Sequence, residues 1–103
     1  MRRVIWSSRG RKLFDRDVVD FLLDKGDAAQ RALDHIERTI ELLARRPIGR
    51  PGRMSGTYEK GVTGQPYIVA YSFLPRDDGG ADDLLILRVV HTARDWPTGR
   101  WPS

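Results

Sequence analysis

The segment LRVVHTARDW, residues 87–96, carries side chains that can hold or cleave a phosphate chain. Arg88, His91 and Arg94 fall within seven residues, and Trp96 follows them. Arginine binds phosphate through paired hydrogen bonds, and the unperturbed pKa of histidine lies near neutrality. These residues predict a ribonuclease site, a surface that grips another protein, or simply the end of a buried strand.

Metal-independent cleavage of RNA needs a base, an acid and cations around the phosphate. His91 and Glu59 can transfer protons, so they are the catalytic candidates if the chain is a nuclease. The residues able to bind a phosphate or a target are Arg50, Arg53, Arg88, Arg94 and Trp96. Trp96 can stack on a base but cannot exchange a proton with a nucleotide, which weighs against nuclease chemistry.

His91 and Arg88 also have structural explanations. His91 can be a strand-end histidine that is hydrogen-bonded to a neighbour such as Glu59. Arg88 stands between Leu87 and Val89, so its charge needs either a carboxylate partner or a solvated concave face. The residue types alone leave the structural and the functional interpretation open.

The sequence carries no sign of a metal or cofactor site. Without cysteine there is no disulfide framework and no thiolate zinc site, which suits a reducing compartment. The acidic residues of 77–83 lack the spacing of a calcium-binding loop because Gly79 and Gly80 interrupt it, so they predict a solvated turn. The sequence has no P-loop and no nucleophile elbow, and we expect no metal and no cofactor.

The net charge of +4 is unevenly distributed along the 103 residues. Residues 17–44 hold seven acids and three bases, which leaves a net charge of +8 for the remainder. Basic residues cluster at 2–16, 45–60 and 88–100. If these clusters converge, they form a positive surface suited to a polyanion or an acidic protein segment, although arginine used only for solubility gives the same composition.

The spacing of apolar residues predicts two amphipathic helices. From about Arg11 onward the apolar residues fall three and four apart, and Gly26 suits the end of this helix. A second helix places Leu33, Ile36 and Ile40 on one face and stops at Pro47. Helices of this length owe most of their stability to packing, so the helical hairpin must cover an apolar surface.

Short β-branched and aromatic runs, separated by turn residues, predict the strands. They are expected at 2–7, 57–62, 67–74 and 84–91, with an irregular loop at 46–56. We therefore expect a single α+β domain over residues 1–103, in which a helical hairpin packs on one face of a small, mostly antiparallel four-stranded sheet. No stretch approaches the length of a membrane span, and we expect a cytoplasmic protein with no membrane partner.

The segments GRPGRMSGTYEKGVTGQPYIVAYSF and LLILRVVHTARDWP resemble the ParE branch of the ParE/RelE toxin superfamily. The resemblance follows the element order of the whole chain and is specific from about Leu43 to Pro97. It implies the toxin of a type II toxin–antitoxin pair, held inactive by a cognate antitoxin whose flexible C-terminal segment lies across it. For ParE-like relatives it implies inhibition of DNA gyrase, and for RelE-like relatives cleavage of mRNA on the ribosome.

The resemblance and the tryptophan ending favour a ParE-like toxin that binds DNA gyrase. The alternative is a RelE-like, ribosome-dependent mRNA endoribonuclease, and a degenerate toxin that only binds its antitoxin is a third interpretation. We expect the antitoxin segment to be amphipathic and partly acidic. The candidate contacts for it are surplus apolar residues and one strand cation, namely Val19, Leu23, Leu42 and Arg88.

Overall fold

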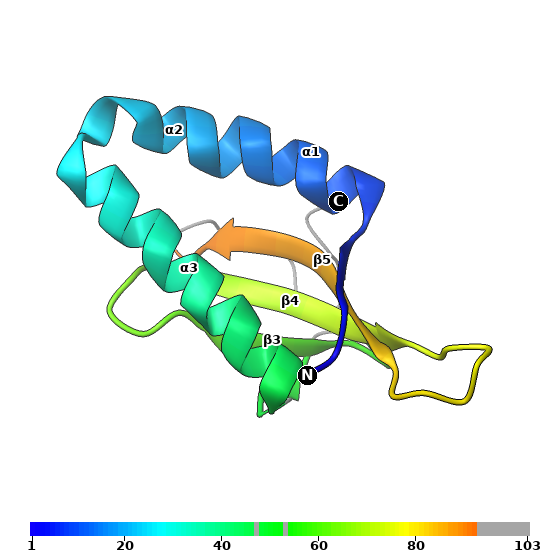
Figure 1. Cartoon of the computed structure of the whole chain (residues 1–103). Helices are drawn as coiled ribbons and strands as arrows, with labels where there is room; N and C mark the ends of the chain where they lie inside the picture. Colours follow the sequence, from blue (N-terminus) through cyan, green and yellow to red (C-terminus); the bar gives the residue numbers. More distant parts are fainter. Residues whose placement is uncertain (47, 53, 93–103) are drawn as a thin grey trace.

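The computed structural model of the chain describes residues 1–46, 48–52 and 54–92. A helical hairpin covers one face of the sheet, as Figure 1 shows, and the sheet has five strands. The strands lie in the spatial order β1, β5, β4, β3, β2. Their bounds are β1 Val4–Trp6, β2 Arg50–Pro51, β3 Tyr58–Gly61, β4 Tyr67–Leu74 and β5 Asp83–His91.

The α+β class, the helical hairpin and the mostly antiparallel pairing are confirmed, but the predicted number of four strands is wrong, because the sheet has five. The fifth strand, β2, lies inside the predicted loop and pairs Arg50 with Glu59 and Pro51 with Tyr58. A proline is compatible with this position because β2 is an edge strand. The sheet is mixed because β1 pairs parallel to β5, whereas the other pairs are antiparallel.

The first helix, α1 (Ser8–Phe14), begins three residues before the predicted start. Ser7 caps it, since the Gly10 N–H donates to the Ser7 hydroxyl at 2.9 Å. The Ser-Ser-Arg-Gly segment that looks like a turn in the sequence is therefore a helix start. A side chain at Gly10 would collide with the backbone carbonyl of Leu87, so glycine allows α1 to lie directly against β5.

The first arm of the hairpin changes its winding after α1. A π-helical turn covers Asp15–Val19, followed by α2 (Asp20–Leu22) and a 3-10 turn at Leu23–Lys25. Within the π turn, the Asp20 N–H donates to the Asp15 carbonyl, five residues earlier. This wider winding brings residues five apart closer to the same side of the helix than an α-helix does.

The second arm is α3 (Asp27–Arg45), which follows Gly26. Gly26 has φ of 58° and ψ of −128°, a backbone conformation that residues other than glycine rarely adopt. The buried side of α3 comprises Ala29, Ala32, Ile36, Thr39, Ile40, Leu43 and Ala44. Burial of this side against the sheet provides the packing that the amphipathic pattern requires.

The core lies between the hairpin and the sheet. From the first arm it receives Phe14, Val18 and Leu22, and from the sheet mainly Tyr67, Val69, Tyr71, Leu84, Ile86 and Val89. The chain start is fixed beside the end of α3, because the Arg2 N–H donates to the Ala44 carbonyl at 2.9 Å. Among the described residues, no helix combines the length and the apolar character needed to cross a membrane.

A β-bulge in β5 determines which side chains face the helices. Tyr71 pairs with Ile86 and Ala70 pairs with Arg88, so Leu87 is an extra residue between the two pairs. On either side of the bulge, Ile86 and Val89 both belong to the core under the helices. Arg88 consequently lies on the other face of the sheet.

Candidate functional site

A row of residues crosses the sheet on the face away from the helices. The strand register aligns Arg50 of β2 with Glu59 of β3, Glu59 with Ala70 of β4, and Ala70 with Arg88 of β5. We call these residues the charged row. Glu59 and Arg88 therefore flank Ala70, two strand spacings or roughly 10 Å apart between Cα atoms.

The charged row is buried at its centre. Glu59 is 4% exposed, Arg88 is 8% exposed and Ala70 is fully buried. The Arg50 side chain is 75% exposed, and its Nη2 atom lies 3.9 Å from Glu59 Oε1. A charge this deeply buried is costly unless opposite charge or hydrogen bonds compensate it. The row therefore has the character of a compensated internal network with one accessible end at Arg50.

His91 does not join the charged row. It pairs with Tyr67 across the β4–β5 ladder, and its ring packs edge-on against the Tyr67 ring with 5.2 Å between centroids. Tyr67 belongs to the core under the helices, so His91 lies on that face of the sheet while Glu59 and Arg88 lie on the other. The two proton-transfer candidates are thus separated by the sheet.

Of the phosphate-binding candidates, the structure brings Arg50 and Arg88 onto one face. Arg53, Arg94 and Trp96 lie outside the described residues. A hollow of about 560 Å³ opens beside Arg50, and Glu59 and Lys60 also line it. This hollow combines cations with a buried carboxylate, so its described residues do not form a purely positive phosphate site.

Gly49 and Tyr71 fix the segment that carries Arg50. The Gly49 N–H donates to the Tyr71 hydroxyl oxygen at 2.9 Å, and a Cβ atom at Gly49 would collide with that hydroxyl and with the Glu59 carbonyl. Burial raises the pKa of Tyr71 above its ordinary value of 10.0, and the Gly49 hydrogen bond partly offsets this rise. A neutral tyrosine is therefore the anchor for the chain entering β2.

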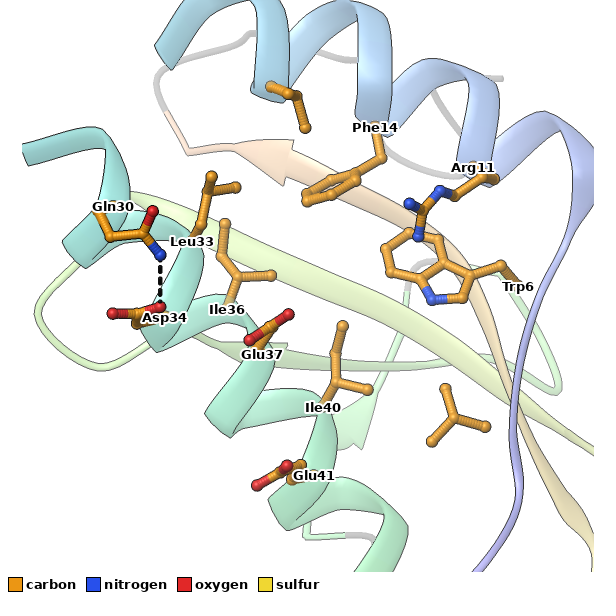
Figure 2. A pocket seen from close by; sticks show the side chains of 12 residues that line it. Trp6, Arg11, Phe14, Gln30, Leu33, Asp34, Ile36, Glu37, Ile40 and Glu41 are labelled. Carbon is orange, nitrogen blue, oxygen red and sulfur yellow. Dashed lines mark hydrogen bonds between the residues drawn. The ribbon is translucent and has the colours of Figure 1, made fainter. Parts of the chain in front are cut away.

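On the helical side, an apolar groove of about 480 Å³ opens between the two arms of the hairpin and β1. Figure 2 shows Trp6, Arg11 and Phe14 on one side of it and the side chains of α3 on the other. Its apolar lining consists of Val4, Trp6, Phe14, Val19, Leu33, Ile36 and Ile40. Phe14 and Val19 both line the groove, since the π turn that ends at Val19 brings residues five apart toward the same side of the helix.

The rims of the groove are polar and differ from each other. Arg11 forms the rim on α1, and its guanidinium lies 5.3 Å from the centre of the Trp6 ring. The rim on α3 carries Asp34, Glu37 and Glu41. The groove is therefore an apolar channel between a basic and an acidic rim.

The predicted antitoxin contacts do not form one continuous surface. Val19 lines the groove, whereas Leu23 is exposed in the turn between the arms and Leu42 is exposed on α3 outside the groove lining. Arg88 lies on the opposite side of the molecule, in the charged row. Sequence reasoning missed Trp6, Phe14 and Leu33 as groove residues because it assigned apolar helix and strand positions to the core.

The acidic hairpin loop has structural partners. Asp83 is buried and pairs with Arg3, whose Nη2 lies 2.7 Å from the carboxylate and whose pKa is raised by that contact. Asp78 accepts a hydrogen bond from the Gly80 N–H at 2.9 Å and pairs with Arg76, and these contacts lower the pKa of Asp78. No cluster of potential metal ligands occurs among the residues that the structure describes.

These features define a small α+β fold with an apolar groove between the arms of its helical hairpin and without an assembled proton-transfer pair among its described residues. The family model for the ParE toxin of the type II toxin–antitoxin system parDE matches residues 4–96. The chain is also 32% identical over 97 residues to "Putative toxin Y4kP" of Sinorhizobium fredii, covering 93% of this chain and 94% of that protein. The chain therefore belongs to the ParE toxin family of type II toxin–antitoxin systems.

Proposed function

We propose that this single-domain protein arrests growth in the cytoplasm by binding DNA gyrase, and that a cognate antitoxin neutralises it by occupying the apolar groove. The family to which the chain belongs implies an antitoxin partner. The target and the docking surface are our own inference. They concern protein–protein contact, with no metal and no cofactor.

The observation that carries this proposal is the separation of His91 from Glu59 by the sheet. A base and an acid that act on one phosphodiester must both reach the same substrate atoms within hydrogen-bond distance. Glu59 is also almost fully buried. This arrangement supports a toxin that acts by binding over a nuclease that uses this pair of residues.

The target is tested with purified protein and DNA gyrase. We expect supercoiling of relaxed plasmid to fall in proportion to added protein, while translation of a reporter mRNA in a reconstituted system continues and the mRNA stays intact. The matched control is His91→Ala, which removes the strand-end imidazole and should inhibit gyrase as the wild type does. Unchanged supercoiling at high molar excess, together with cleaved mRNA, would establish the ribosome-dependent endoribonuclease instead.

The neutralisation surface is tested in cells that co-express the antitoxin. Leu33 lies on the groove and is only half-buried, so Leu33→Asp places a charge on the groove floor without removing a fully buried side chain. We expect this variant to remain toxic and to escape neutralisation. Leu42→Asp is the matched control, since Leu42 is exposed on the same helix outside the groove lining, and it should be neutralised normally. Neutralisation of both variants to the same extent would refute the docking site.

A further inference from the structure

We infer that the apolar groove selects an amphipathic helix with lysine or arginine along one flank, and that the unlike charges of its rims fix the direction in which this helix lies. The inference rests on the proposed docking of the antitoxin in the groove. It adds the charge and the orientation of the segment that fits. The amphipathic, partly acidic segment expected from the sequence thereby gains a basic flank, which faces the acidic rim, and keeps its acidic flank for Arg11.

The acidic rim is continuous along α3. Asp34, Glu37 and Glu41 are three and four residues apart, the spacing that aligns side chains along one side of a helix. Glu37 and Glu41 are exposed, and neither makes an ion pair within the part of the chain that the structure describes. Asp34 accepts a hydrogen bond from Gln30 at 2.9 Å, and this neutral amide does not cancel its negative charge.

The opposite rim is basic and is formed by Arg11. The Arg11 guanidinium lies over Trp6 at 5.3 Å and near Phe14 at 6.0 Å from the ring centres, so the aromatic floor supports it. Its Nε atom is 3.6 Å from the Asp15 carboxylate, which is itself exposed and does not line the groove. The Arg11 side chain is still 57% exposed, which leaves donors available to an acidic group on a partner.

Between the rims, the floor demands an apolar stripe. Trp6 and Phe14 pack together with 5.0 Å between their ring centroids, and Val4, Val19 and Leu33 remain only partly buried in the free chain. A helix laid into such a groove buries the residues at every third and fourth position and keeps its two flanks at the rims. Each flank of the bound helix then meets a rim of one sign.

The two flanks of a bound helix exchange places when the helix is turned end for end. In one direction its basic flank faces Glu37 and Glu41 and its acidic flank faces Arg11. In the other direction like charges meet at both rims, which costs binding free energy and rejects that arrangement. The groove therefore distinguishes both the charge pattern and the direction of the segment.

The test uses peptides of roughly 18 residues, about 27 Å long when helical, that share one leucine stripe. The first peptide has arginine on one flank and glutamate on the other, and the second has glutamate on both flanks. Binding to the full chain is measured by fluorescence anisotropy at low ionic strength. We expect the first peptide to bind at least about tenfold more tightly, and equal affinities would overturn the inference.

Charge reversal of the acidic rim supplies the second measurement. The double variant E37K/E41K should weaken the first peptide by about 10- to 100-fold and strengthen the second. The control D20K/D24K makes the same change in net charge at exposed positions outside the groove lining, and should alter both affinities equally and little. Identical effects of the two double variants would show a response to net charge alone and refute the inference.

Direction is measured by NMR with a nitroxide at the N-terminus or the C-terminus of the first peptide. We expect each label to broaden amide signals near only one end of the part of α3 that lines the groove, Gln30 or Glu41, and the two labels to broaden opposite ends. Broadening of both ends by each label would refute a fixed direction. These binding measurements need no toxicity, so failure of the gyrase assay with intact charge selectivity would refute the target and leave the groove inference standing.

Discussion

The two sides of the sheet use charge in opposite ways. On the face away from the helices, which we call the strand side, Glu59 and Arg88 are buried in the charged row, and only Arg50 of that row is largely exposed. On the helical side, the charges stand at the rims of an apolar groove in which Trp6, Val19 and Leu33 are only partly buried. Buried charges contribute when their compensation is complete, whereas rim charges around an apolar floor contribute to recognition. From this difference we propose that the strand side stabilises the fold and that the helical side binds a partner.

The largest expected effect tests the structural character of the strand side. Arg88→Ala should lower the free energy of unfolding by about 3 kcal/mol, because it removes a buried cation from the face that holds the Glu59 carboxylate. Urea denaturation measures this loss. The double variant R88M/E59M replaces both charges by apolar side chains and should recover most of it. If Arg88→Ala is as stable as the wild type and only toxicity is lost, the strand side is a target-binding surface.

The next effect concerns the anchor of β2. Gly49→Ala should cost about 1–3 kcal/mol of folding free energy, because the added methyl group collides with the Tyr71 hydroxyl and the Glu59 carbonyl. Gly61→Ala is the matched control, since a Cβ atom there meets no neighbour within 4 Å. Thermal melting of both variants measures the difference, and equal melting temperatures would contradict the close packing at Gly49.

Tyr71→Phe should cost about 1 kcal/mol, because the Gly49 N–H loses its acceptor. The pKa of Tyr71 is raised in the folded chain, so its contribution to stability is complete below the ordinary value of 10.0 and is lost as pH rises through the folded pKa. Urea titrations between neutral pH and pH values above 10.0 therefore compare wild type and variant. A wild type that loses no more stability than Tyr71→Phe over this range would contradict the assignment.

Leu33→Asp should have a smaller effect on stability, within about 1 kcal/mol, because Leu33 is only half-buried in the groove. Its effect on antitoxin binding should be far larger, which isothermal calorimetry measures directly. For Arg88→Ala we expect the opposite, namely a large loss of folding stability and a small loss of antitoxin binding. A loss of folding as large as that of Arg88→Ala would remove the contrast between the two sides.

The smallest effect is expected in the exposed hairpin loop, at Asp78. Its pKa is lowered by the Gly80 N–H and Arg76, so its stabilising contribution is present above the ordinary value of 3.8 and disappears as pH falls through the folded pKa. Asp78→Asn should therefore change the melting temperature slightly at neutral pH and not at all in acid. Asp77→Asn serves as the control, and a pH-independent difference between the variants would contradict this explanation.

The sequence predicted the long elements well because their patterns are local. Strand β4 has the predicted bounds, and the periodic face of α3 is buried as expected apart from Leu33. Strand β2 could not be predicted, since two residues among prolines and glycines have no periodicity and form a strand only by pairing with Tyr58 and Glu59. The parallel pairing of β1 is likewise a tertiary property that no local pattern encodes.

The candidate site was harder to predict because it depends on which face each side chain takes. Arg88 and His91 are three residues apart, and strict alternation already places such residues on opposite faces of a strand. The groove was hard to predict from the sequence because its floor has the composition of a core. The acidic residues Asp34, Glu37 and Glu41, which line one side of a helix, were the feature that could have indicated it. Whether apolar residues are covered is decided by the angle between the helices, which the residue types leave unspecified.

The additional residue Leu87 shifts the alternation of inward and outward side chains along β5 by one position. Upstream of it, even-numbered residues such as Leu84 and Ile86 point toward the helices, and downstream the odd-numbered Val89 and His91 do so. If the same residues alternated regularly without the bulge, Arg88 would share the face of Leu84 and Ile86 and its guanidinium would lie beneath the hairpin. One insertion thus determines that a cation can occupy an otherwise apolar strand without entering the core.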